Sequence, residues 1–115
     1  MRWRPSGVDM RLYLCGPMRG LPLNNYPAFN AAASRLRALG HQVFNPAEED
    51  GVDNGRTFTH FMERDLPEVC RAEAVVVLPG WRESRTGAFL ETHLARLCRK
   101  PLYDSDTLTP IWRIK

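Results

Sequence analysis

The sequence contains one uninterrupted aliphatic run, Ala-Val-Val-Val-Leu at positions 74–78, which ends at Pro79 and Gly80. A strand whose residues are apolar on both of its faces is typical of a parallel sheet covered by helices on both sides. Proline and glycine then end the strand and begin a loop. A chain of 115 residues is long enough for one such sheet with its helices, and too short for a second hydrophobic core.

Short apolar runs and helical patterns alternate along the rest of the chain. The sequence predicts strands at 11–15, 42–44, 74–78 and 101–103, and helices at 27–39, 57–71 and 85–98. It predicts a loop at 47–56, a kink or break of the second helix at Pro67, and no definite element after 103. Strands that alternate with helices imply right-handed crossovers. The predicted fold is therefore α/β: a single-domain, flavodoxin/Rossmann-like parallel sheet of four to five strands with helices on both faces.

Several classes of protein do not fit the sequence. Residues 1–9 contain no apolar segment, so we expect a flexible N-terminal extension rather than a signal peptide, followed by one domain at 10–115. No stretch approaches the ~20 apolar residues of a membrane span. The three cysteines and three histidines show no metal-ligand spacing. We expect reduced thiols in or near the core of a cytoplasmic protein, with no metal and no cofactor.

The charge of the chain gives a weak indication of its ligand. A net charge of +3 is too small to indicate nucleic-acid binding. Every Lys or Arg position other than Lys100 and Lys115 is an arginine. Arginine forms two parallel hydrogen bonds to phosphate or carboxylate. We therefore expect a small anionic ligand, and neither a nucleic acid nor a membrane as partner.

Ligands of parallel sheets bind where the strands end at their carboxyl edge. Three segments leave strands at that edge: 16–20 (Gly-Pro-Met-Arg-Gly), Asn45-Pro46 and 79–87. In the first segment, Gly16 and Gly20 permit close approach of the backbone, and Arg19 offers a guanidinium group to a phosphate. The alternative is a plain turn from strand to helix.

The third segment opens the last predicted helix. Free amide groups at a helix start attract phosphate. Ser84 or Thr86 is expected to bond the same phosphate, to serve as the helix N-cap, or to do both. Trp81 is expected either to stack on a nucleobase or to anchor the loop.

Two carboxylates lie in apolar surroundings. Glu91 lies about one turn into the last predicted helix, and is interpreted either as facing a ligand or as a solvated surface residue. Asp65 shares a helical face with Phe58, Met62 and Val69, which suits a general acid or base. The alternative is a capping box, in which Asp65, Pro67 and Glu68 begin a new helix.

The motifs taken together resemble one family. They are Leu-Tyr-Leu-Cys-Gly-Pro-Met-Arg-Gly at 12–20, Asp65, Ala-Glu-Ala-Val-Val-Val at 72–77, Gly87 and Glu91. This combination, over residues 10–103, resembles the nucleoside 2-deoxyribosyltransferase-like superfamily, with 2′-deoxynucleoside 5′-monophosphate N-glycosidases among the closest matches. Two positions depart from the pattern. Glu73 stands where an aspartate is usual, and Ser84 lies one residue further from Glu91 than in the monophosphate glycosidases.

The resemblance implies chemistry at an N-glycosidic bond. Glu91 would attack the anomeric carbon, and Asp65 would help to protonate the departing base. The predicted substrate-binding residues are Gly16, Met18, Arg19, Gly20, Asn45, Trp81, Ser84, Thr86 and Gly87. Two carboxyl groups that divide these roles are typical of retaining glycosidases. The resemblance also implies a homodimer.

These observations lead to a ranked set of functions. The leading hypothesis is a hydrolase that cleaves the base–sugar bond of a (deoxy)nucleoside 5′-monophosphate through Glu91. The alternatives are a nucleoside 2-deoxyribosyltransferase, a nucleotide-binding or sensor module without catalysis, and a purely structural domain. A Glu91→Ala substitution separates catalysis from binding, because base release would disappear while ligand binding would survive.

Overall fold

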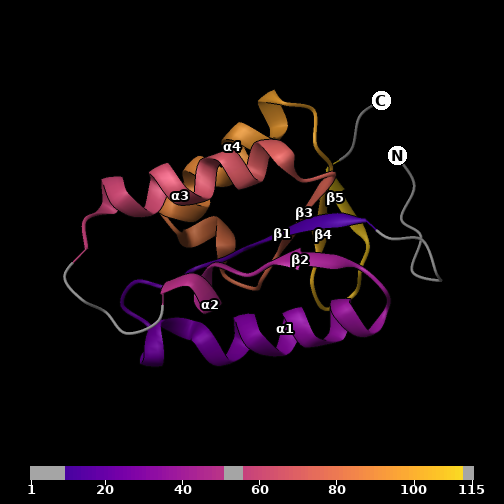
Figure 1. Ribbon diagram of the computed structural model, residues 1–115, viewed down its shortest axis with the longest axis horizontal. Helices are drawn as coiled ribbons and strands as arrows, with labels where there is room; N and C mark the ends of the chain where they lie inside the picture. Colours follow the sequence, from indigo (N-terminus) through magenta and orange to yellow (C-terminus); the bar gives the residue numbers. More distant parts are fainter. Residues whose placement is uncertain (1–9, 51–55, 113–115) are drawn as a thin grey trace.

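The computed structural model describes residues 10–50 and 56–112 and shows one α/β domain (Figure 1). Its strands are β1 (Arg11–Cys15), β2 (Gln42–Phe44), β3 (Ala74–Val77), β4 (Leu102–Asp104) and β5 (Pro110–Trp112). Its helices are α1 (Tyr26–Ala38), α2 (Pro46–Asp50), α3 (Phe58–Arg71) and α4 (Gly87–Leu97), with short 3-10 turns η1 (Pro22–Asn25) and η2 (Trp81–Glu83). The predicted extension at 1–9 lies outside the described residues. No helix within the described ranges is long and apolar enough to cross a membrane.

The five strands form one sheet in the order β2-β1-β3-β4-β5. The pairs β1–β2, β1–β3 and β3–β4 are parallel, which confirms the predicted α/β class and parallel arrangement. The fifth strand differs, because β5 pairs antiparallel with β4. The turn between them is held by the Asp104 carboxylate, which accepts hydrogen bonds from the amides of Asp106 and Thr107. The segment after 103, left unassigned from the sequence, is therefore the second half of a hairpin.

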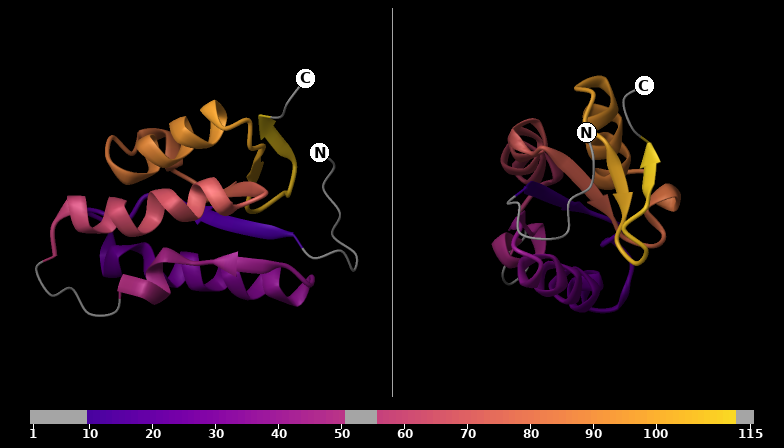
Figure 2. Two further views of the ribbon diagram at one scale, coloured as in Figure 1. Left: turned by 45° about the horizontal axis from the view of Figure 1, so that its top comes forward. Right: turned by 90° about the vertical axis from the view of Figure 1, so that its right-hand side faces the viewer.

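Helices cover both faces of the sheet, as predicted (Figure 2). All four residues of β3 are buried, and they alternate between two core clusters. Ala74 and Val76 pack on the α1 side with Phe29 and Leu36. The opposite cluster contains Val75 and Val77 with Val69 of α3 and with Ala88 and Ala95 of α4. The aliphatic run therefore forms the central strand, buried on both faces.

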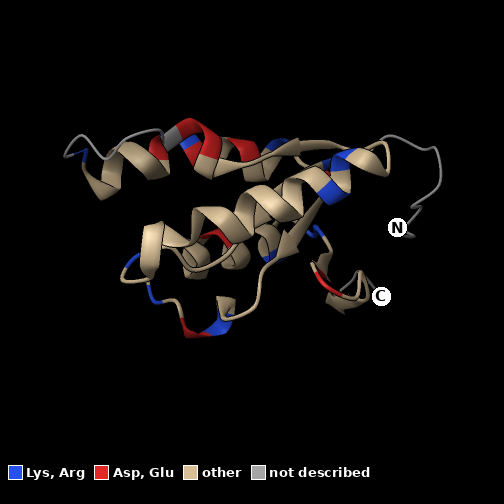
Figure 3. Ribbon diagram, turned by 90° about the horizontal axis from the view of Figure 1, so that it is seen from below, with Lys and Arg blue, Asp and Glu red and all other residues tan. Residues whose placement is uncertain are grey.

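A short helix, α2, occupies part of the predicted loop at 47–56. The Asn45 side chain starts it by accepting a hydrogen bond from the Ala47 amide at 3.1 Å. Pro46 suits a first helical position, and Glu48 and Glu49 suit the positive end of the helix dipole. Arg37 of α1 also donates hydrogen bonds to both carboxylate oxygens of Glu48, at 2.6 and 2.8 Å. Glu48 and Glu49 are among the acidic residues drawn red in Figure 3. The loop prediction was wrong here because these stabilising contacts come from outside the segment.

Of the kink or break predicted at Pro67, the break is absent, and the kink stays a prediction. α3 runs without interruption from Phe58 to Arg71, with Pro67 on its exposed side. Its opposite face buries Asp65 and Val69 and packs against α4. Packing therefore outweighs the lost backbone hydrogen bond. The capping-box interpretation of Asp65 is wrong as well, because no helix begins there.

The cysteines are only partly where they were expected. Cys15 is buried in the core, whereas Cys70 and Cys98 are exposed, and all three are free thiols.

Glu73, which departs from the superfamily pattern, joins the starts of two strands. It accepts a hydrogen bond from the Arg11 amide at 2.9 Å. Arg11 begins β1 and Glu73 immediately precedes β3, so this contact lies at the end of the sheet opposite to the carboxyl edge. Glu73 therefore joins two strand starts.

Candidate active site

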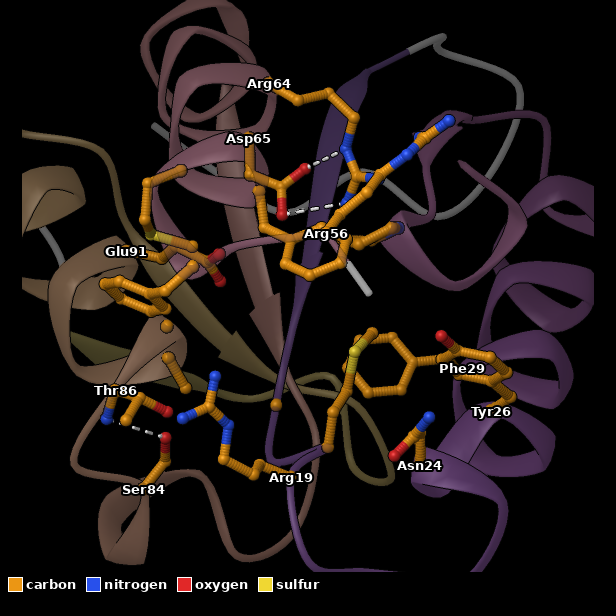
Figure 4. Close-up of a pocket in the computed structure, with 18 residues that line it drawn as sticks. Arg19, Asn24, Tyr26, Phe29, Arg56, Arg64, Asp65, Ser84, Thr86 and Glu91 are labelled. Atoms are coloured by element: carbon orange, nitrogen blue, oxygen red, sulfur yellow. Dashed lines mark hydrogen bonds and ion pairs between the residues drawn. The ribbon is translucent and has the colours of Figure 1, made fainter. Parts of the chain in front are cut away.

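A cavity of about 270 Å³ lies at the carboxyl edge of the sheet (Figure 4). Its wall combines segments that are far apart in the sequence: the loop after β1, the start of α1, the first half of α3 and the start of α4. Its volume is close to the lower end of the range of about 300–1,000 Å³ for small-molecule sites. Parallel topology therefore builds a pocket of one-ligand size at the place where this fold class binds ligands.

Glu91 projects into this pocket from the first turns of α4 (Figure 4). Its residue is only 6% exposed. A Cβ atom placed on Gly87, one turn earlier, would lie 3.6 Å from Glu91 Oε2, so the carboxyl group lies over the start of its own helix. Thr92 fixes the same turn, because its hydroxyl donates to the Ala88 carbonyl at 2.8 Å. Glu91 therefore faces the cavity, and its interpretation as a solvated surface residue is wrong.

The surroundings of Glu91 favour its protonated form. Burial, followed by the charge of Asp65, raises the pKa of Glu91 to about 8. Tyr13 and Cys15 of β1, together with the charge of Arg64, act in the opposite direction. Burial also raises the pKa of both Tyr13 and Cys15, so these two groups stay neutral at physiological pH. The Tyr13 hydroxyl is buried without a partner at hydrogen-bonding distance, yet it is close enough to lower the pKa of Glu91.

Asp65 reaches the same pocket from α3 and forms an ion pair with its neighbour in sequence. Arg64 Nε donates to Asp65 Oδ1 at 2.6 Å, and Arg64 Nη2 donates to Oδ2 at 3.0 Å. The Arg64 guanidinium also lies over the Phe61 ring, 5.4 Å from its centroid. A bidentate, charge-assisted contact of this kind stabilises the ionised carboxylate. The pocket thus contains one carboxyl group that favours a proton and one that is held as an anion.

The opposite end of the pocket carries groups suited to an anion. Figure 4 shows the Arg19 side chain extending towards Ser84 and Thr86. The Ser84 hydroxyl accepts a long hydrogen bond, 3.5 Å, from the Thr86 amide, and no side chain caps α4. Thr86 occupies the N-cap position, as one of the predictions had it, but its hydroxyl makes no capping hydrogen bond, and Ser84 is not the N-cap. The first amides of α4 remain available to a ligand rather than to a capping side chain.

Comparison with known proteins identifies the family. A family model described as "Domain of unknown function (DUF4406)" matches residues 10–104. The chain belongs to the DUF4406 family. No curated protein matches it.

Four solved chains resemble this DUF4406 domain. One is a 2-deoxyribosyltransferase from the psychrotolerant bacterium Bacillus psychrosaccharolyticus, described as a biocatalyst for synthesis of antiviral and antitumoral nucleosides. It aligns with a TM-score of 0.66 and 26% sequence identity, over 82% of this chain and 70% of its own. The resemblance to the nucleoside 2-deoxyribosyltransferase-like superfamily, predicted from motifs, is confirmed.

The DUF4406 domain brings most of the predicted site residues together. Gly16, Met18, Arg19, Asp65, Ser84, Thr86, Gly87 and Glu91 line the pocket. Gly20, Asn45 and Trp81 are not part of its lining. Asn45 is buried, and its side-chain amide donates to Asn30 at 2.9 Å. Trp81 packs against the core cluster beneath α4, with Arg82 over its ring. Contact of these three residues with a ligand stays a prediction.

Sequence reasoning missed several lining residues of the DUF4406 domain: Asn24, Tyr26, Phe29, Pro46, Arg56, Phe58, Phe61, Met62, Arg64 and Ala88. The sequence did indicate where Phe58 and Met62 lie, because their spacing places them on the same apolar face of α3 as Asp65. It did not indicate Arg64, because adjacent residues on a helix do not normally face each other. Among the described residues, no group of three or more histidines, cysteines or acidic side chains could hold a metal ion.

Proposed function

We propose that the chain hydrolyses the N-glycosidic bond of a (deoxy)nucleoside 5′-monophosphate. One observation carries the proposal: the buried Glu91 carboxyl faces the pocket in which Asp65 lies near it and Arg19 lies at the other end. A carboxylate suits an anomeric carbon that gains positive charge. A guanidinium group suits a 5′-phosphate.

The reaction divides between the two carboxyl groups. The Glu91 carboxylate attacks C1′ while the base departs, and Asp65 delivers a proton to a nitrogen of the base. Water then cleaves the glycosyl ester on Glu91, and the sugar leaves with retained configuration. Because the pKa of Glu91 is about 8, roughly nine-tenths of this carboxyl is protonated at pH 7 in the empty pocket. The two groups together hold the single proton that the first step requires.

The end of the pocket at Arg19 favours a nucleoside monophosphate over a free nucleoside as the substrate. Arg19 supplies the positive charge, and Ser84, Thr86 and the first amides of α4 supply hydrogen bonds. Between the two ends, Phe58, Phe61 and Met62 offer apolar surface to a base or sugar ring.

A second candidate is transfer of the sugar to another base. The similarity to a 2-deoxyribosyltransferase favours it. The first half-reaction is the same, and the acceptor of the glycosyl ester is a base instead of water. Free nucleosides would then be substrates, and Arg19 would contribute little to binding.

The test is release of free base from a panel of nucleoside 5′-monophosphates and matching nucleosides, followed by chromatography with and without a second base. If the chain is a hydrolase, free base should be released from monophosphates even when no second base is present as an acceptor. Glu91→Gln should abolish release and retain nucleotide binding. Glu49→Gln, an exposed residue of α2 outside the pocket, is the matched control. A folded wild type that binds nucleotides and releases no base from any of them would instead indicate a binding module.

The homodimer and the cytoplasmic location expected from the sequence stay predictions. Size-exclusion chromatography with light scattering measures the first of them directly.

A further inference from the structure

The contact between Arg64 and Asp65 joins two neighbours on one helix. The guanidinium group holds both carboxylate oxygens, with N–O distances of 2.6 and 3.0 Å. The Asp65 side chain is 6% exposed and that of Arg64 is 21% exposed. Adjacent helical residues point in different directions, so the Arg64 side chain folds back along α3 to make this contact. Its position over the Phe61 ring fixes that path.

Both residues of this contact affect the pKa of Glu91. Tyr13 and Cys15 of β1 and Asp65 and Arg64 of α3 all act on Glu91 of α4. Asp65 raises the pKa of Glu91, and Arg64 lowers it. Among the residues that the structure describes, Arg19 and Arg56 are the other charged ones that line this pocket. Two carboxyl groups that interact share their protons as a pair, unless a third group holds one of them as the anion.

We propose that Arg64 is a positioning residue that determines which of the two carboxyl groups carries the proton of the substrate-free pocket. While Arg64 holds Asp65, Asp65 is the anion and Glu91 holds the proton. When this contact opens, the proton passes from Glu91 to Asp65. The catalytic consequence rests on the proposed function, whereas the position of the proton does not.

The proton transfer leaves the chemistry balanced. The Glu91 O–H bond breaks and an Asp65 oxygen gains the proton, so the pair keeps one proton and one negative charge. The Glu91 carboxylate then forms a bond to C1′, and the C1′–N bond breaks with its electrons moving to the base. Asp65 then donates the proton to that nitrogen. No oxidant or further reactant is required.

The structure also suggests what opens the contact. Arg64 lines the cavity, and under the proposed function the base of the substrate lies in the same cavity. Nucleobases present carbonyl and ring-nitrogen acceptors to arginine. These acceptors compete with Asp65 for the guanidinium group, and the nucleophile is therefore activated when a base is present.

The test follows the two carboxyl groups by carbon-13 NMR across a pH titration of the substrate-free protein, with signals assigned by Glu91→Gln and Asp65→Asn. In the wild type, each signal should titrate in one main step. In Arg64→Gln, both signals should show two steps, because the proton is now shared. The Asp65 midpoint should rise by about 1–3 pH units. Arg71→Gln removes an equal charge from an exposed position on α3 and should titrate as the wild type does.

Arg64→Lys keeps the proposal testable if Arg64→Gln does not fold. Lysine retains the charge and cannot form the two parallel bonds, so the Asp65 midpoint should still move to higher pH. Titration curves of the folded Arg64 variants that match the wild type would overturn the proposal.

The two proposals fail in distinguishable ways. Absence of base release from every nucleotide overturns the glycosidase function and leaves the NMR result unaffected. If base is released, the acidic limb of kcat/KM should move to higher pH in Arg64→Gln. A change in KM alone, with unchanged pH limbs, would instead make Arg64 a simple binding residue and would overturn the positioning role.

Discussion

Glu91 and Asp65 reach one pocket from two different helices, α4 and α3, and the charge of Asp65 raises the pKa of Glu91. Each side chain is nearly inaccessible to bulk water. The pair therefore couples folding to pH as well as preparing the site for chemistry.

Stability should fall as the pH rises from about 5 to 8. The pKa of Glu91 is about 8 in the folded chain against an ordinary value of 4.5. Between these values the folded state holds a proton that the unfolded state lacks. The stabilising contribution is complete below 4.5 and is lost as the pH rises through 8, with a slope of at most about 1.4 kcal/mol per pH unit.

Urea denaturation at several pH values between 5.5 and 8.5 measures this slope. Glu91→Gln should remove it and should be more stable than the wild type at pH 8.5. Glu49→Gln, an exposed carboxylate outside the pocket, should keep the wild-type slope. Equal slopes for the wild type and Glu91→Gln would contradict the raised pKa.

Arg19→Gln should weaken a monophosphate substrate selectively. A charge-assisted hydrogen bond contributes about 1.5–3 kcal/mol, so kcat/KM for the monophosphate should fall about 10- to 150-fold. The value for the matching free nucleoside should change little, because that molecule offers no phosphate. Arg82→Gln is the control, since Arg82 is exposed beside Trp81 and outside the pocket. Equal losses on both substrates would place Arg19 away from the phosphate.

Much of the fold could be predicted because its signals are local. The aliphatic run at 74–78 contains β3, whose four residues are all buried, and the helix predicted at 27–39 is α1. The rule that ligands bind at the carboxyl edge of a parallel sheet correctly predicted that Gly16, Arg19 and Ser84 line one pocket.

The features missed from the sequence depend on contacts between distant elements. The helix α2 depends on Asn45 and on Arg37 of α1, and β5 exists only by pairing with β4. The Arg64–Asp65 contact has no periodic signature, because the arginine side chain bends along its own helix. Trp81 illustrates the converse, since an aromatic residue in a loop suits base stacking and core packing equally well until the fold is known.

Pro67→Ala should stabilise the protein. Pro67 lies in the interior of α3 on its exposed side, where it leaves the Glu63 carbonyl without its helical donor. Alanine restores the donor and removes the steric cost, and the greater freedom of the unfolded chain cancels part of this gain. The net increase in the free energy of unfolding should be about 1 kcal/mol or more. Thermal and urea denaturation measure it, and a decrease would mean that α3 needs the proline for its packing.

Gly16→Ala and Gly87→Ala should separate stability from access to the site. A Cβ on Gly16 would lie 2.8 Å from Leu78 Cβ in the core, so backbone must shift and stability should fall by about 1–3 kcal/mol. A Cβ on Gly87 would lie 3.4 Å from Met62 Cε and 3.6 Å from Glu91 Oε2, which the flexible methionine can accommodate. Gly87→Ala should therefore fold with stability close to that of the wild type.

The added methyl of Gly87→Ala would nevertheless occupy the space beside the Glu91 carboxyl group, where the sugar must approach. Base release should fall in this variant although the protein remains folded, and denaturation together with the base-release assay measures both effects. Full activity in Gly87→Ala would mean that the sugar reaches Glu91 from another side of the pocket.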